Sequence, residues 1–162
     1  MKNKRPEELL VEKLIERKET IASMESCTAG YFATTIANVE GASSVLHFSA
    51  ITYSNDYKIR LGVDKDIIKE YGVYSFETSK QMAKKISFFA ESTYGIGITG
   101  KINRQDENNP RGDTNLIYIS IYNNKRGNYY NIRVKCPDKP RLTCKKLIVN
   151  RILKKMLEII EE

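Results

Sequence analysis

The stretch ESCTAG, residues 25–30, places three side chains that can carry chemistry between an apolar segment and a helical pattern. IASM before it is typical of a short buried strand, and YFATTIANV after it is apolar at helical spacing. Ser26 would therefore project into a cleft as a nucleophile, near N–H groups around Cys27, Thr28 and Ala29 that could bind a phosphate or a developing oxyanion. Cys27 is the rival nucleophile, since thiols are intrinsically more reactive. The structural alternative is that Ser26 or Thr28 only caps the helix.

A second stretch, TYSNDYK, supplies a candidate base. It puts Tyr53 at the end of an expected strand, Ser54 or Asn55 at the cap of the next helix, and Lys58 in the first turn of that helix. The positive end of the helix dipole disfavours a charged lysine there, and partial burial would lower its pKa further. Ser26 and Lys58 would then form a histidine-free nucleophile–base pair, with Tyr53 relaying a proton or holding the lysine. In the structural alternative, Lys58 is solvated and Tyr53 packs in the core.

Other catalytic chemistries find little support in the residues. The single histidine, His47, lies early in an expected strand with no acid near it in the sequence. The three cysteines, Cys27, Cys136 and Cys144, are odd in number and scattered, which favours neither a disulfide framework nor a metal site. Neither a Walker lysine loop nor a GxGxxG motif is present, and the RGD at 111–113 is interpreted as a chance match. We expect no metal and no cofactor.

Length and composition are typical of one globular domain spanning residues 1–162. Hydrophobic residues make up 41% of the chain and charged residues 29%, as in ordinary globular proteins. No apolar run approaches the ~20 residues that a membrane helix needs. MKNKRPEELL contains no apolar signal segment. We therefore expect a cytoplasmic protein without membrane association.

The net charge of +7 raises the question of nucleic-acid binding. Lysine and arginine are spread along the whole chain, and none of the basic runs joins a recognisable nucleic-acid motif. The pattern instead favours a basic surface that attracts an anionic small molecule.

The order of predicted elements indicates the fold class. The expected elements are a helix at 6–20, a strand at 21–24, a helix to about 38, a strand at 47–54, helices at 55–62, 64–72 and 79–92, a strand at 94–100, hairpin strands at 115–123 and 127–135, and a helix from 141. A cap signal at Ser75 precedes the helix at 79–92. Helices alternate with strands early and a hairpin closes the series, which predicts an α/β fold: a single compact domain whose mixed β-sheet is covered by helices.

Several segments, taken in order, resemble the CinA C-terminal domain family. ESCTAG, EGASSV, TYSNDYK, LGVDKDIIKEYGVYSFET and GIGITG are similar to the family patterns ESCTGG, PGSS, YSNxxK, GVxxxxLxxxGAVSxxT and TGIAGPGG. The resemblance runs from about Ile21 to Gly100 and continues more weakly to the C-terminus. It implies a compact three-layer α/β domain that commonly self-associates as a homo-oligomer.

The resemblance also implies an activity. Stand-alone members of the family are nicotinamide-nucleotide amidases, which hydrolyse nicotinamide mononucleotide (NMN) to nicotinate mononucleotide and ammonia without a metal. By that resemblance Ser26 is the nucleophile, Lys58 its base, and Tyr53 an assisting residue. The small-molecule nucleotide substrate would contact residues within the same motifs, namely Cys27, Thr28, Gly30, Asn55, Thr99 and Gly100.

Two positions depart from the family pattern. Ala29 replaces a glycine, which would matter if that residue needs a positive φ or a close approach to substrate. KINRQD, residues 101–106, replaces IAGPGG, so Lys101 and Arg104 would have to supply phosphate contacts from their side chains. We expect the polar loop at 101–114, which has no apolar anchor beyond Ile102, to be the most mobile internal segment. The alternative prediction is a non-catalytic nucleotide-binding or assembly module of the same fold.

Overall fold

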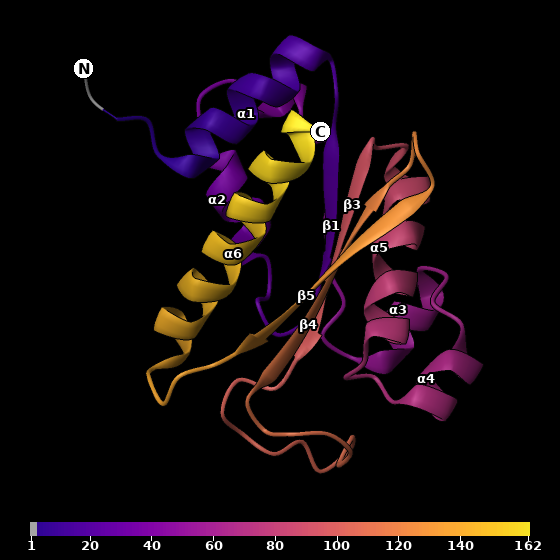
Figure 1. Ribbon diagram of the computed structural model, residues 1–162. Helices are drawn as coiled ribbons and strands as arrows, with labels where there is room; N and C mark the ends of the chain where they lie inside the picture. Colours follow the sequence, from indigo (N-terminus) through magenta and orange to yellow (C-terminus); the bar gives the residue numbers. More distant parts are fainter. Residues whose placement is uncertain (1–2) are drawn as a thin grey trace.

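Five segments of the chain form strands, and those at 21–25 and 94–100 are buried along their whole length. They are β1 (Ile21–Glu25), β2 (Ala50–Ile51), β3 (Tyr94–Gly100), β4 (Leu116–Asn123) and β5 (Asn128–Lys135). In the computed structural model, which describes residues 3–162, they make one sheet in the order β2-β1-β3-β4-β5 (Figure 1). β1 pairs in parallel with β2 and β3, whereas β4 is antiparallel to both β3 and β5. The sheet is therefore mixed, as predicted.

Helices cover both faces of this sheet. They are α1 (Pro6–Arg17), α2 (Tyr31–Ala37), α3 (Asn55–Arg60), α4 (Lys65–Tyr71), α5 (Phe76–Ala90) and α6 (Arg141–Glu161), with a 3₁₀ turn, η1, at Ala42–Ser44. α1, α2 and α6 pack together on one side, and α5, with α3 and α4, lies on the other (Figure 1). This arrangement confirms the predicted three-layer α/β fold.

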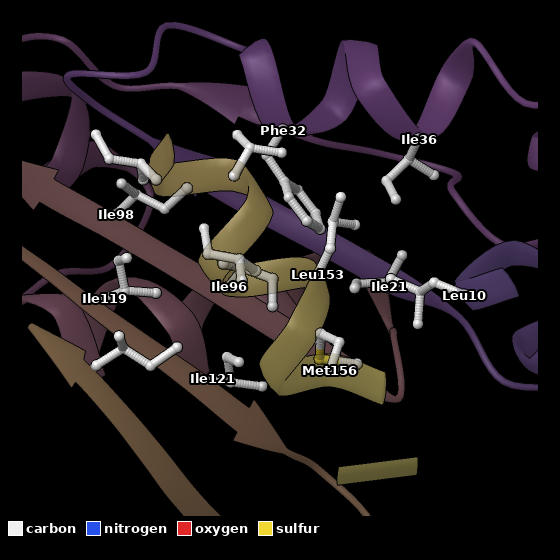
Figure 2. Close-up of a cluster of buried hydrophobic side chains, with 14 of the residues drawn as sticks. Leu10, Ile21, Phe32, Ile36, Ile96, Ile98, Ile119, Ile121, Leu153 and Met156 are labelled. Carbon is white, nitrogen blue, oxygen red and sulfur yellow. The ribbon is translucent and has the colours of Figure 1, made fainter. Parts of the chain in front are cut away.

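The main hydrophobic core lies between the sheet and the layer of α1, α2 and α6 (Figure 2). Ile96 from β3 and Ile119 from β4 face Phe32 of α2 and Leu153 and Met156 of α6. All five side chains are fully buried. Burial of side chains of this size stabilises a fold by about 1.5–3 kcal/mol each, so this cluster fixes the sheet against α6.

Glycines in β3 bring α5 into direct contact with the sheet. In YGIGITG the isoleucines point into the main core, and the alternating glycines face α5. A Cβ on Gly97 would lie 2.2 Å from the carbonyl oxygen of Ser79, and one on Gly95 would lie 2.0 Å from that of Ala83. Only glycine permits so close an approach, so these two residues set the distance between α5 and β3.

The predicted boundaries differ most from the structure at three elements. The strand predicted at 47–54 pairs only at Ala50–Ile51, because the Ser49 hydroxyl accepts a hydrogen bond from the Ser23 N–H (3.0 Å) where a backbone carbonyl would otherwise pair. The first helix ends at Arg17 instead of 20, since Lys18 adopts a left-handed conformation with φ 54°. α5 begins at Phe76, three residues before the predicted start, whereas its predicted cap at Ser75 is confirmed.

Candidate active site

Ser26 lies at the carboxyl edge of the parallel strands. Its N–H donates to the carbonyl of Ile98 (3.0 Å), which continues the pairing of β1 with β3 for one more residue. The ends of β1, β2 and β3 meet at this edge, and the loop after β3 and the start of α6 lie at the same end of the sheet (Figure 1). Ligands commonly bind at such an edge of an α/β sheet.

Glu25 fixes the turn that carries the serine. Its fully buried carboxylate accepts hydrogen bonds from the Thr28 hydroxyl (2.7 Å) and from the backbone N–H groups of Phe32 and Ala33 (3.0 Å each). A carboxylate at a helix N-terminus is stabilised by the helix dipole, so Glu25 fastens α2 to β1. Sequence reasoning missed this role, although an acid at the end of an apolar strand was a visible signal.

Lys58 lies beside the serine, as predicted. Its Nζ is 3.1 Å from the Ser26 Oγ and donates to the Thr52 carbonyl at 2.7 Å. The side chain is only 1% exposed, and no carboxylate within the described residues forms an ion pair with it. Burial lowers the pKa of Lys58 to about 8, against opposing charge effects from Cys27 and Asp106. A neutral amine is therefore accessible near physiological pH.

Cys27 is unsuited to act as the nucleophile. The thiol is buried, and burial, together with the nearby Cys136 and Glu25, raises the pKa of Cys27 to about 12. Because the thiolate is the reactive form, this thiol is inert at neutral pH. The geometry and charge state of the site favour Ser26 over its neighbour.

The turn after Ser26 explains the glycines of the family motif. Ala29 has a left-handed conformation with φ 48°, and Gly30 follows with φ 89°. The Ala29 N–H donates to the Ser26 carbonyl (2.9 Å), so it is not the free donor that the sequence suggested. The N–H groups of Cys27 and Thr28 have no acceptor among residues 3–162. Cys27 also lines the cleft in front of Ser26 and Thr28 does not, so the Cys27 N–H is the remaining candidate for an oxyanion site.

A cleft of about 1210 Å³ opens in front of the serine and lysine. Its lining comes from the ends of β1 and β3, from α3, from the loop after β3, and from residues 139–141 at the start of α6. Among the predicted substrate-binding residues, Cys27, Asn55 and Gly100 line this cleft.

The other predicted contacts serve the scaffold. Thr28 donates to Glu25, Gly30 supplies the left-handed turn, and the buried Thr99 hydroxyl donates to the carbonyl of Val73 (3.0 Å). None of these three side chains or positions lines the cleft. These three residues therefore support the backbone around the site.

Tyr53 lines the cleft, and its hydroxyl is hydrogen-bonded to Arg141 instead of to Ser26 or Lys58. It is 63% exposed, and its hydroxyl accepts a hydrogen bond from the Arg141 guanidinium at 3.4 Å. The same guanidinium donates to the carbonyl of Ile102 (3.1 Å). Arg141 was not singled out from the sequence, because only the fold brings the start of α6 to the ends of the strands.

The loop at 101–114 is fastened at several points. The buried Lys101 amine donates to the side chain of Gln105 (3.0 Å) and to the carbonyl of Gly112 (3.3 Å). Arg111 donates to the carbonyls of residues 68–70 at the end of α4. The loop therefore has polar anchors in addition to the apolar Ile102, and its mobility stays a prediction.

Asp106 projects from this loop into the cleft. Its carboxylate accepts hydrogen bonds from the Tyr74 hydroxyl (2.5 Å), the Asn109 amide (2.9 Å) and the Asn108 N–H (3.0 Å). These donors, led by Tyr74, hold the pKa of Asp106 below its usual value. An ionised carboxylate therefore shares the cleft with the serine and the lysine.

Neither a group of metal ligands nor a membrane-spanning helix is found in the described part of the chain. Within residues 3–162, no three histidine, cysteine or acidic side chains are grouped closely enough to hold a metal ion. No helix in the same range combines the length and apolar character needed to cross a membrane.

The protein is a three-layer α/β domain. A buried serine–lysine pair lies in its cleft, where the central strands end. The family model of the CinA C-terminal domain matches residues 3–160. The chain therefore belongs to the CinA C-terminal domain family.

Relatives and solved structures agree with this assignment. A competence-damage inducible protein of Alkaliphilus metalliredigens is 41% identical over 73% of this chain and 29% of its own length. One from a Thermoanaerobacter strain is 37% identical over 74% of this chain and 29% of its own length. The chain thus spans less than a third of the length of these curated relatives. A CinA superfamily protein of Klebsiella pneumoniae matches the fold with a TM-score of 0.87 at 18% identity, covering 98% of this chain and 99% of that one. A competence/damage inducible protein of Agrobacterium tumefaciens gives 0.82 at 23% identity, with 98% of both chains covered.

Proposed function

We propose that this protein is an amidohydrolase that converts NMN to nicotinate mononucleotide and ammonia, with Ser26 as nucleophile and Lys58 as base. The observation that carries the proposal is the buried Lys58 Nζ, 3.1 Å from the Ser26 Oγ, with a pKa lowered to about 8. Membership of a family whose stand-alone members are nicotinamide-nucleotide amidases, as the motifs imply, supports the choice of substrate.

The pair accounts for acylation. The neutral Lys58 amine accepts the hydroxyl proton of Ser26 as the Oγ attacks the carboxamide carbon. The N–H group of Cys27 is the donor available to the oxyanion that develops. The Lys58 ammonium then returns the proton to the amide nitrogen, ammonia leaves, and an acyl-enzyme on Ser26 remains.

Deacylation uses the same base. Lys58 accepts a proton from a water molecule, the hydroxide attacks the ester carbon, and the Ser26 hydroxyl is regenerated as the carboxylate product forms. The hydrogen bond to the Thr52 carbonyl (2.7 Å) keeps the amine oriented through both halves of the reaction. Tyr53 and Arg141 lie at the mouth of the cleft, where they would contact substrate rather than relay the proton.

Ammonia release is the direct test. Purified protein is incubated with NMN and a chelator, and ammonia and nicotinate mononucleotide are quantified together. We expect the two products in equal amounts, with no loss of rate on chelation. Release of free nicotinamide, or no reaction, would contradict the proposal.

The second candidate is a nucleotide-binding or assembly module without turnover. It is favoured by one observation: the loop that replaces the family glycines is fastened through Lys101 and Arg111. Calorimetric binding of NMN without ammonia release would support this candidate. Replacing residues 101–106 by IAGPGG should then restore turnover if Ser26 and Lys58 are still poised for chemistry.

A further inference from the structure

Asp106 is a charged group that the proposed chemistry does not use. Every hydrogen bond to its carboxylate comes from a neutral donor: Tyr74, Asn108 and Asn109. No lysine or arginine within residues 3–162 forms an ion pair with it. Its negative charge is therefore fixed in position but not neutralised by a direct partner.

Basic residues outnumber acids in the rest of the cleft lining, where the exposed Asp56 and Glu107 are the other acids. Lys101, Arg104, Lys139 and Arg141 line it together with Lys58. Two of these cations have neutral partners: Lys101 lies 5.0 Å above the Tyr74 ring and Arg141 bonds to Tyr53 and a carbonyl. Asp106, which is partly buried whereas Asp56 and Glu107 are exposed, thus makes a fixed negative region within a cleft whose lining carries a net positive charge.

This negative region is close enough to affect the catalytic base. The charge of Asp106 is one of the two effects that oppose the lowering of the Lys58 pKa. A substrate whose amide carbon reaches Ser26 therefore places the atoms around that amide within the field of the carboxylate. A positive charge on the ring that bears the amide would be stabilised there, and a neutral ring would gain nothing.

We propose that Asp106 is a specificity-determining residue that selects substrates whose amide-bearing ring is cationic, such as an N-ribosylated pyridinium, over neutral rings of the same shape. This inference rests on the proposed function, since it concerns the same cleft. The substrate class is a zwitterionic nucleotide, whose pyridinium faces Asp106 and whose phosphate lies among the basic residues. KINRQD then supplies a specificity-determining carboxylate where the family has glycines.

The test compares NMN with its 1,4-dihydro form, which has the same ribose, phosphate and carboxamide but an uncharged ring. Binding of both nucleotides is measured by calorimetry in the Ser26→Ala variant, which prevents turnover. We expect the cationic ring to bind about fivefold to tenfold more tightly, as one partly screened charge pair allows. Adding Asp106→Asn should reduce this preference to within about twofold, because the neutral amide keeps the shape but not the charge.

Glu107→Gln is the matched control. It removes one negative charge from the neighbouring residue of the same loop, whose side chain is exposed and lines the same cleft. The preference should survive this change, and circular dichroism should show that each variant is folded.

Three outcomes would overturn the inference: an unchanged preference in Asp106→Asn, an equal loss in Glu107→Gln, or no binding of either nucleotide. The proposed function is judged separately, since it fails only if the unmodified protein releases no ammonia from NMN.

Discussion

At the scale of single residues, Lys58 is the side chain whose environment is most unusual. It is buried beside a hydroxyl and a carbonyl, and burial lowers its pKa to about 8 from an ordinary value of 10.5. The unfolded chain therefore holds the proton more tightly than the folded chain between these pH values. Stability contributed by this residue is lowest below pH 8 and rises as the pH increases towards 10.5.

Comparing the protein with Lys58→Met measures this effect without reference to activity. From urea unfolding at pH 7.5 and pH 10, we expect the free energy of unfolding of the unmodified protein to rise by about 2 kcal/mol relative to the variant. Methionine has a similar length and no charge, so other titrating groups cancel in the difference. Parallel stability profiles for the two proteins would show that Lys58 is not a buried amine.

The candidate site residues differ in how well the neighbouring sequence predicts their positions. Ser26 and Lys58 could be predicted because each belongs to a short motif at the junction of a strand or turn with a helix. Thr28 and Thr99 carry equally good motif signals, yet their hydroxyls bond inward to Glu25 and Val73. Sequence alone does not give the direction of a side chain at a turn, as for Thr28, or at the end of a strand, as for Thr99, so these two positions could not be told apart from true cleft residues.

At the scale of elements, the turn into α2 is held in a strained conformation. Ala29 has φ 48°, a region that costs a residue with a Cβ about 1–2 kcal/mol. Glu25 holds the turn in place through the Phe32 and Ala33 N–H groups. The departure from ESCTGG is therefore tolerated at a cost in stability. Residue 29 does need a positive φ, which glycine would adopt more easily than alanine.

Ala29→Gly should relieve this strain. After allowing for the greater entropy of glycine in the unfolded chain, we expect a gain of about 0.5–1 kcal/mol and a rise in Tm of about 2–4 °C. Ala33→Gly in α2, the helix that follows this turn, is the matched control and should lose about 1 kcal/mol, since Ala33 is helical. A lower Tm for Ala29→Gly would show that the turn is not left-handed at this residue.

Element boundaries followed the sequence where caps and periodicity are strong. The cap at Ser75 and the alternation of glycine and isoleucine in YGIGITG were both visible in the sequence. The contact of Gly95 and Gly97 with α5 explains this alternation. The shortness of the edge strand β2 could not be predicted, because its pairing is interrupted by the hydroxyl of Ser49. That contact joins residues 26 positions apart and leaves no local signal.

At the scale of the whole molecule, the fold gathers the cleft from four distant parts of the chain. Ser26 follows β1, Lys58 is on α3, Asp106 is in the loop between β3 and β4, and Arg141 begins α6. The layer order was predictable from the succession of helices and strands. The approach of α6 to the loop between β3 and β4 could not be predicted, because it depends on how α6 packs across the core. Arg141 and Asp106 were therefore missed as parts of the site.

The central claim is that Ser26 and Lys58 act as one catalytic unit. Ammonia release from NMN is measured above pH 8, where Lys58 is neutral, for Ser26→Ala, Lys58→Ala, the double variant and Cys27→Ala. We expect each single change in the pair to lower the rate by about a thousandfold or more, and the double variant to be within about tenfold of either, because residues that act as a unit are not additive. Cys27→Ala should keep most of the activity, since its thiol is protonated and buried. Losses that multiply in the double variant, or activity that survives Ser26→Ala and disappears in Cys27→Ala, would contradict the account.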